Sequence, residues 1–215
     1  LCDWRGSLMC DDYAGYKALF ADEQVIEGGC WAHARRKFHD IYQANGSSVA
    51  EQALQQIQRL YHYEAEARNL SPPERLAHRQ RHMEPALKQL ARWLRSQFEL
   101  VPPNSAIAKA IRYSLNNWLA LTRLLEDAQL PMDNNAVENL IRPLAIGRKN
   151  WLFVGSEKAG RRAAAVMSLI QSAKLNGHDP YAYLKDVLER LPTQKAKDIT
   201  ELLPHRWQAP NDTKN

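Results

Sequence analysis

The chain has few cysteines and no long apolar run. Its 3 cysteines are too few for a disulfide framework, and a low, odd count suits a reducing compartment. No apolar stretch approaches the roughly 20 residues that span a bilayer. The N-terminal residues 1–5 show neither the charged nor the apolar part of a signal peptide. We therefore expect a cytoplasmic protein.

Repeats and low-complexity segments are also missing, as is any Ser-His-Asp or Cys-His arrangement of a covalent nucleophile. The composition is that of a globular protein, with 45% hydrophobic and 25% charged residues among 215. This length fits one large domain, or one domain with a sizeable insertion. The net charge of +5 is compatible with a polyanionic partner without establishing one.

Short apolar runs occur at the start of the chain. Two strands with a short helix between them are predicted at 7–10, 13–21 and 24–27. The first strand presents Asp11 and Asp12 at its carboxyl end, and Gly28 and Gly29 are expected to stop the second. We expect the two strands to pair.

From residue 31 the apolar spacing becomes helical. Helices are predicted over 31–44, 49–69, 71–98, 106–127, 133–146, 157–175 and 179–191. Asp133 is the expected cap of its helix. A strand-like run follows at 151–154, and the tail from Pro204 is expected to fray. The fold class is therefore α/β with a strong excess of helix.

Three acidic residues are candidates for metal chemistry. Asp11 and Asp12 supply the carboxylate oxygens that Mg²⁺ prefers, although a turn with solvated side chains explains the pair, taken alone, more simply. Glu138 lies four positions before Arg142 on one helix face. That spacing fits a surface ion pair, or a metal ligand flanked by an arginine that binds phosphate.

Basic residues cluster at two further places. Arg148 and Lys149 precede Trp151, which either stacks on an unpaired base or packs in the core. A second cluster at a helix start consists of Arg35, Arg36 and Lys37. These side chains either contact a DNA phosphate or are simply solvated.

Cys30 and His33 have the spacing of half a zinc site. A closed structural zinc site needs four ligands, and no convincing second pair is present. Cys2 and Cys10 lie on the other side of the second predicted strand. We therefore do not predict zinc.

Taken together, these stretches resemble the transposases of insertion sequence sixty-six. The matching segments are LMCDDYAGY (8–16), GCWAHARRKF (29–38), DNNAVE (133–138) and IGRKNWLFVGS (146–156). The segments AKLNG (173–177) and LLP (202–204) resemble the C-terminal region of that family. The resemblance covers essentially the whole chain.

The resemblance implies a partial ribonuclease H-like core with an Asp-Asp-Glu triad, interrupted by a large all-helical insertion. Asp11 matches the second acid and Glu138 the third, whereas Asp12 falls where relatives often have Gly. The first Asp is expected on a strand before residue 1, so we expect the chain to be a fragment or the product of a truncated element, inactive alone. The implied domains are catalytic core (1–30), insertion (31–130), returning core (131–178), and C-terminal helix and tail (179–215).

The implied activity is metal-dependent cleavage and strand transfer at transposon ends. Two Mg²⁺ or Mn²⁺ ions, about 3.5–4 Å apart, would activate water and then the freed 3′-hydroxyl. The implied partners are double-stranded DNA of the ends and target, further copies of the chain and accessory proteins, with a location on the nucleoid.

The residues expected to contact DNA are Arg35, Arg36, Lys37, Arg142, Arg148 and Lys149. Cys30 and His33 match a family signature whose role the sequence does not reveal. The alternative to the enzyme is a non-catalytic helical module for DNA binding or assembly, left from a truncated transposase.

Overall fold

The computed structural model describes residues 4–21, 24–151 and 155–209, and the side chains of all of these except 148–151. Contacts within the chain define two compact units, unit 1 (Leu1–Glu138) and unit 2 (Asn139–Asn215). None of the described helices is long and apolar enough to cross a membrane.

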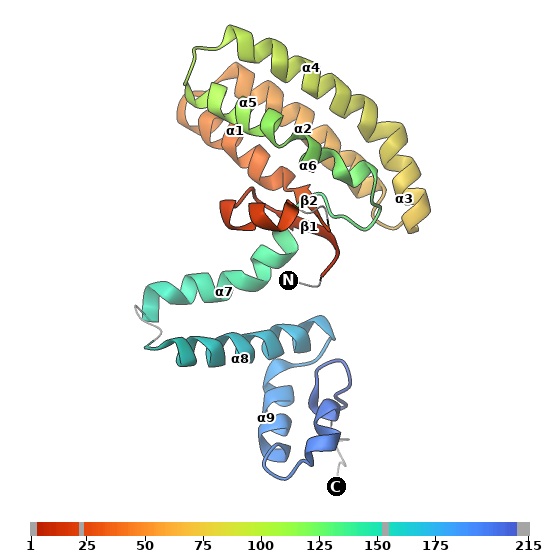
Figure 1. Ribbon diagram of the computed structural model, residues 1–215, viewed down its shortest axis with the longest axis vertical. Coiled ribbons are helices and arrows are strands. Elements are labelled where there is room, and N and C mark those ends of the chain that lie inside the picture. The colour runs from red at the N-terminus through yellow and green to blue at the C-terminus, as the bar shows by residue number, and fades with distance from the viewer. Residues whose placement is uncertain (1–3, 22–23, 152–154, 210–215) are drawn as a thin grey trace. The chain divides into compact units, whose positions relative to one another are not determined.

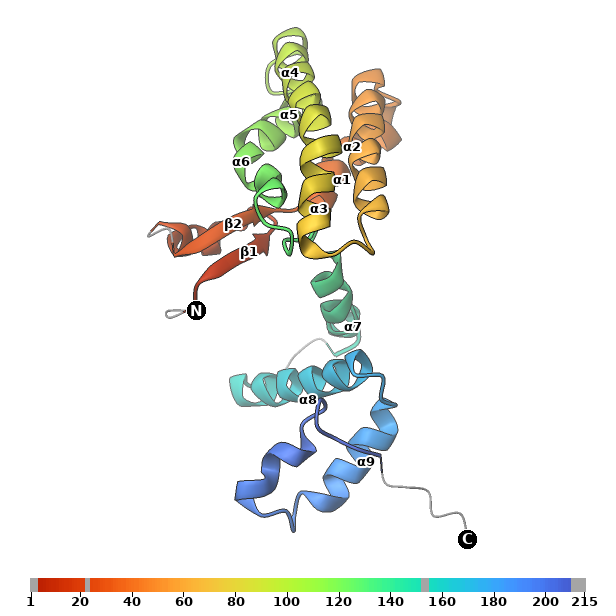
Figure 2. The same ribbon diagram turned by 90° about the vertical axis from the view of Figure 1, so that its right-hand side faces the viewer.

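The sheet of unit 1 is small and parallel. Strand β1 (Gly6–Cys10) pairs with β2 (Val25–Gly29), and a 3₁₀ helix, η1 (Ala14–Phe20), connects them (Figures 1 and 2). The predicted pairing is therefore confirmed. Two strands do not define a ribonuclease H-like core, which stays a prediction.

Gly28 and Gly29 do not stop the second strand as expected, because they belong to it. A Cβ on Gly29 would lie 2.9 Å from the backbone nitrogen of Leu121, and one on Gly28 would lie 2.9 Å from Leu130 Cδ1. These glycines are needed because helix α6 and the segment after it approach the strand closely.

Every described element between residues 31 and 127 is helical, as predicted. In order these are α1 (Trp31–Asn45), α2 (Ser48–Glu66), α3 (Pro72–His78), η2 (Arg79–Met83), α4 (Glu84–Leu100), α5 (Ala106–Asn116), α6 (Trp118–Thr122) and η3 (Arg123–Leu125). Helices α1, α2, α4 and α5 lie side by side (Figure 1). Their shared core includes Phe38, Ile57, Leu60 and Ile111, each no more than 1% exposed.

Two predicted helices are interrupted. The helix predicted over 71–98 contains the π-helical turn η2, which precedes Pro85. Pro85 has no N–H for the carbonyl of Arg81, so the helical bonding pattern shifts there. The helix predicted over 106–127 breaks at Asn117, whose side chain donates to the carbonyl of Tyr113 at 2.9 Å and competes with the backbone.

Helix α7 spans Asn135–Trp151. It starts two residues after Asp133, which still accepts a hydrogen bond from the backbone of Asn135 at 3.1 Å. The helix also extends beyond its predicted end at 146, so the strand predicted from Trp151 does not begin there. The rest of that predicted strand, 152–154, lies outside the described residues.

Unit 2 contains most of α7 together with α8 (Glu157–Leu175), α9 (Pro180–Arg190) and a 3₁₀ helix, η4 (Ala196–Leu202). Its small core includes Tyr183, whose hydroxyl donates to the carbonyl of Leu202 at 2.8 Å. Trp207 is 5% exposed and donates to Asp186 at 2.7 Å. The prediction that the tail frays from Pro204 is therefore wrong up to Trp207, because the indole buries its apolar ring and satisfies its N–H.

Candidate functional site

Asp11 and Glu138 meet around one imidazole. Asp11 directly follows β1, His33 lies in the first turn of α1, and Glu138 lies in the first turn of α7. His33 Nε2 is 3.8 Å from Asp11 Oδ2 and 3.3 Å from Glu138 Oε1. Thus the structure brings together the two acids that the sequence singled out, although they are far apart in the chain.

The register of the sheet brings Asp11 close to the start of α1. Cys10 pairs with Gly29, so the end of β1 and the residues after β2 lie at the same edge. Trp31, fully buried, anchors that edge. Its indole N–H donates to the carbonyl of Leu121 at 2.9 Å, and its backbone N–H donates to the carbonyl of Met132 at 3.1 Å.

Hydrogen bonds made just before α7 position Glu138. Tyr61 donates to Asp133 Oδ2 at 2.9 Å, and the backbone N–H of Glu138 donates to the carbonyl of Asn134 at 3.0 Å. The helical spacing of apolar residues that include Val137 predicts that this helix packs an apolar face on the sheet and so positions Glu138. Val137 is instead 56% exposed, so polar contacts rather than apolar burial hold this turn.

Cys30 and His33 connect the start of α7 to Asp11 and Glu138. Cys30 is 1% exposed, and burial raises the pKa of its thiol, which keeps the proton on sulfur. The thiol donates to Asn134 Oδ1 at 3.0 Å, and its sulfur lies 3.2 Å from His33 Nδ1. The signature pair therefore orients the imidazole, whose other nitrogen faces Asp11 and Glu138.

Asp12 has a different environment from Asp11. Its φ of 69° lies in the left-handed region that favours glycine. Its carboxylate lies 2.5 Å from Lys17 Nζ and accepts from Asn117 at 3.2 Å. Burial opposes the charge on Lys17, but hydrogen bonds to Asp12 and Glu27 outweigh it and raise the lysine pKa. Asp12 is thus already paired within the protein.

The two acids suit a hard cation that the substrate helps to bind. Their side chains are 43% and 38% exposed, so water and phosphate oxygens have access. Within the described part of the chain, no group of three or more His, Cys, Asp or Glu side chains is arranged to hold a metal. Mg²⁺ commonly takes one or two carboxylates and completes its shell with water and phosphate, so Asp11 and Glu138 fit such an ion.

The predicted DNA contacts on α1 divide into two faces. Arg36 Nη2 lies 3.9 Å from Glu138 Oε2, at the site. Arg35 is half-buried on the same side of the helix. Lys37 points elsewhere, with Nζ 4.2 Å above the ring centre of Tyr113. Among the described residues, His33 approaches Glu138 to 3.3 Å and Arg36 to 3.9 Å, and both come from α1.

The other predicted DNA contacts lie on α7. Arg142 is exposed on this helix. The side chains of Arg148 and Lys149 lie outside those that the structure describes, as does that of Trp151. The phosphate contacts of all these residues stay predictions.

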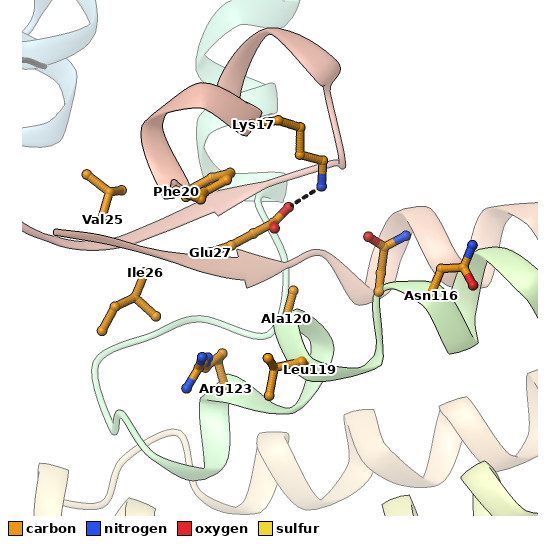
Figure 3. Close-up of a pocket in the computed structure, with 10 residues that line it drawn as sticks. Lys17, Phe20, Val25, Ile26, Glu27, Asn116, Leu119, Ala120 and Arg123 are labelled. Atoms are coloured by element: carbon orange, nitrogen blue, oxygen red, sulfur yellow. Dashed lines mark hydrogen bonds and ion pairs between the residues drawn. The ribbon is translucent and has the colours of Figure 1, made fainter. Parts of the chain in front are cut away.

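A cavity of about 560 Å³ lies between β2 and α6 (Figure 3). Lys17, which lines it, points toward Glu27 and pairs with it at 2.9 Å. Arg123, which also lines it, pairs with Glu126 at 2.7 Å. Because the protein's own acids neutralise these cations, this cavity offers little net charge to an anion.

Sequence reasoning missed the supporting residues of the site. Asn134 lies inside the segment DNNAVE (133–138) quoted above. Its hydrogen bond to Cys30, however, joins positions more than a hundred residues apart. Tyr61 lies inside α2, and Asn117 lies inside the helix predicted over 106–127, and polar residues in helices are usually solvated. Their roles depend on contacts between elements distant in the chain, which periodicity does not report.

Two family models, both of IS66, match this chain. The family model described as Transposase IS66 family matches residues 1–162, and that of the IS66 C-terminal element matches residues 168–205. An uncharacterized protein of Sinorhizobium fredii, y4jD, is 37% identical over 97% of this chain and 42% of its own length. Two others from that organism, y4hP and y4qI, are 33% and 35% identical, each over 97% of this chain and 41% and 40% of their own lengths.

The chain spans about two fifths of the length of these curated relatives. No solved structure matches it. The resemblance drawn from the sequence motifs is confirmed by the two family models.

Proposed function

Since the chain belongs to the IS66 transposase family, we propose that it supplies two metal-binding carboxylates, Asp11 and Glu138, to a DNA transposase. The observation that carries this proposal is that both acids face one imidazole although they come from opposite ends of unit 1. The proposed reaction is cleavage and strand transfer at the ends of the mobile element.

The chemistry follows from the groups at this edge. A divalent cation held there would polarise a phosphodiester and favour deprotonation of the attacking water or hydroxyl. The carboxylate oxygens of Asp11 and Glu138 would bind this cation. His33 lies between the two carboxylates and keeps them facing each other. Arg36, beside Glu138, is placed to bind a non-bridging phosphate oxygen.

The ribonuclease H-like architecture is part of the same proposal. A parallel strand pair with an acid directly after β1 supports it, because ligands gather at the carboxyl ends of parallel strands. A third acid from another part of the longer protein would complete the site. Double-stranded DNA, further copies of the chain and accessory proteins are the proposed partners, with a cytoplasmic location on the nucleoid.

The test uses the longer protein that contains this chain and the DNA ends of its own element. Asp11→Asn and Glu138→Gln should each lower Mg²⁺- or Mn²⁺-dependent cleavage by roughly 10³-fold, because a catalytic metal contributes several kcal/mol to the transition state. DNA affinity should stay near that of the wild type. Asp40→Asn is the matched control, since Asp40 is a solvated acid on α1 with a 70% exposed side chain.

Full cleavage by either variant would show that the substituted acid is not a catalytic metal ligand. If the wild-type longer protein bound its DNA ends but cleaved them with neither metal, the non-catalytic alternative, a helical DNA-binding or assembly module, would replace the enzyme. Gel-based cleavage and equilibrium DNA binding on the same samples separate these outcomes.

A further inference from the structure

One face of α1 lines a second cavity, of about 450 Å³, beside the candidate site. Its lining residues are Ala32, Arg35, Arg36, His39, Gln58, Tyr61 and Asn135. Of the four from α1, Ala32 precedes Arg35 and Arg36 by three and four positions, and His39 follows them by four and three, so all four share one side of the helix. Asn135 begins α7, one turn before Glu138, so this cavity adjoins the proposed metal ligands.

The cations of this cavity are poorly neutralised. Arg35 has no ion-pair partner among the side chains that the structure describes. Arg36 approaches Glu138 only to 3.9 Å. The cavity beside Lys17 differs, because its cations are paired at 2.9 Å or less. An anion therefore gains more from the cavity on α1.

The uncharged groups of the cavity match a nucleobase as well as a phosphate. The hydroxyl of Tyr61 is engaged by Asp133 at 2.9 Å, which fixes the ring at the cavity wall. Gln58 and Asn135 supply amides, which both donate and accept hydrogen bonds. Phosphate-binding arginines, a fixed aromatic ring and amides together are the groups that hold an unpaired nucleotide.

We propose that this cavity receives one unpaired nucleotide of the DNA strand being processed, next to the phosphate held at Asp11 and Glu138. The proposal rests on the proposed function and adds a subsite to it. Arg35 and Arg36 bind the backbone of this nucleotide, Tyr61 stacks on its base, and Gln58 reads the edge of the base. A base stacked inside a duplex does not fit, because it must leave the helix to enter a cavity.

Lys37 provides a matched control on the same helix. Its ammonium lies over the ring of Tyr113, outside the cavity. A lysine in that place contacts duplex phosphates without distinguishing paired from unpaired strands. Removing Lys37 should therefore weaken all DNA binding equally, whereas removing Arg35 or Gln58 should act on unpaired DNA.

The experiment measures fluorescence anisotropy of this chain with two labelled probes. One is a blunt duplex, and the other is the same duplex with a short single-stranded 3′ extension. The wild type should prefer the extended probe by about tenfold, the scale of one stacked base and one phosphate contact. Arg35→Ala and Gln58→Ala should abolish the preference, while Lys37→Ala should keep it, with both affinities lower and a reduced salt slope.

Thermal melting of the variants checks that they are folded. We expect an unaltered melting temperature for Gln58→Ala, because Gln58 is exposed on α2. Equal binding of both probes by the wild type, or equal losses on both probes in Arg35→Ala and Gln58→Ala, would overturn the cavity assignment alone. Failure of this chain to bind either probe would overturn the cavity assignment, whereas the cleavage assay on the longer protein tests the proposed function separately.

Discussion

Two regions of unit 1 are stabilised in different ways. They are the helical block (residues 48–125) and the site edge beside it (Asp11, Cys30, His33, Asn134 and Glu138). The block buries large apolar side chains such as Leu60 completely. The acids of the site edge stay 43% and 38% exposed and depend on a few hydrogen bonds from distant elements. Changes in the block should therefore lower stability, and changes at the edge should lower metal binding while the fold survives.

The largest effect on folding should come from Leu60→Ala in the block. Leu60 is 0% exposed, and truncation leaves a cavity that the surrounding helices fill only partly. The free energy of unfolding should fall by about 2–5 kcal/mol, measured by urea denaturation. Leu100→Ala is the control, because Leu100 is 76% exposed and should cost little. Equal effects of the two would contradict this account of the block.

A smaller loss is expected from Glu64→Gln. Arg79 is 1% exposed and makes two bonds to this carboxylate, at 2.9 and 2.6 Å. The amide leaves the buried guanidinium without its counter-charge, which should cost about 3 kcal/mol in urea denaturation. Glu84→Gln, which breaks only a solvated pair with Lys88, should cost about 0.5 kcal/mol or less. A Glu64 variant as stable as the Glu84 variant would rule out a structural role for the buried pair.

Cys30→Ala, at the site edge, should have a modest effect on the free energy of unfolding and a clear effect on metal affinity. Removing the link from Asn134 to His33 should cost about 1–2 kcal/mol of stability. The affinity for Mn²⁺ should fall about tenfold, as is typical when a group that orients a metal site is lost. Cys30→Ser should restore part of the affinity, because a hydroxyl also donates to Asn134. An unchanged affinity in Cys30→Ala would show that the signature pair does not orient the site.

The smallest effect should come from Asp12→Gly, next to Asp11. Glycine relieves the strain of a φ of 69°, worth about 1 kcal/mol. The lost, partly exposed pair with Lys17 costs up to about 1 kcal/mol, so stability should change little. Mn²⁺ affinity should be unchanged. A fall in affinity like that of an Asp11 variant would show that both acids belong to the site.

Much of the block could be predicted because its helices follow from local periodicity. Ala53, Ile57 and Leu60 repeat at helical spacing, and the structure buries all three. The interruptions at Pro85 and Asn117 needed more than periodicity. They arise from one missing N–H and one competing side chain, which leave the apolar pattern unchanged.

The site was predictable in part for a different reason. Asp11 and Glu138 lie in motifs whose family resemblance singled them out, and the structure brings them together. Their supports could not be read from the sequence. Tyr61 and Asn134 act through contacts across the fold, and Val137, expected to be buried, is exposed.

The most direct test of the central claim is Mn²⁺ binding to this chain, followed by electron paramagnetic resonance of the free ion. The wild type should show weak, saturable binding, because it supplies two carboxylates and the described residues place no third ligand beside them. Asp11→Asn and Glu138→Gln should each lower the affinity by about tenfold or more, whereas Asp40→Asn should leave it unchanged. Equal Mn²⁺ binding by the wild type, Asp11→Asn and Glu138→Gln would contradict the assignment of these two acids as a metal site.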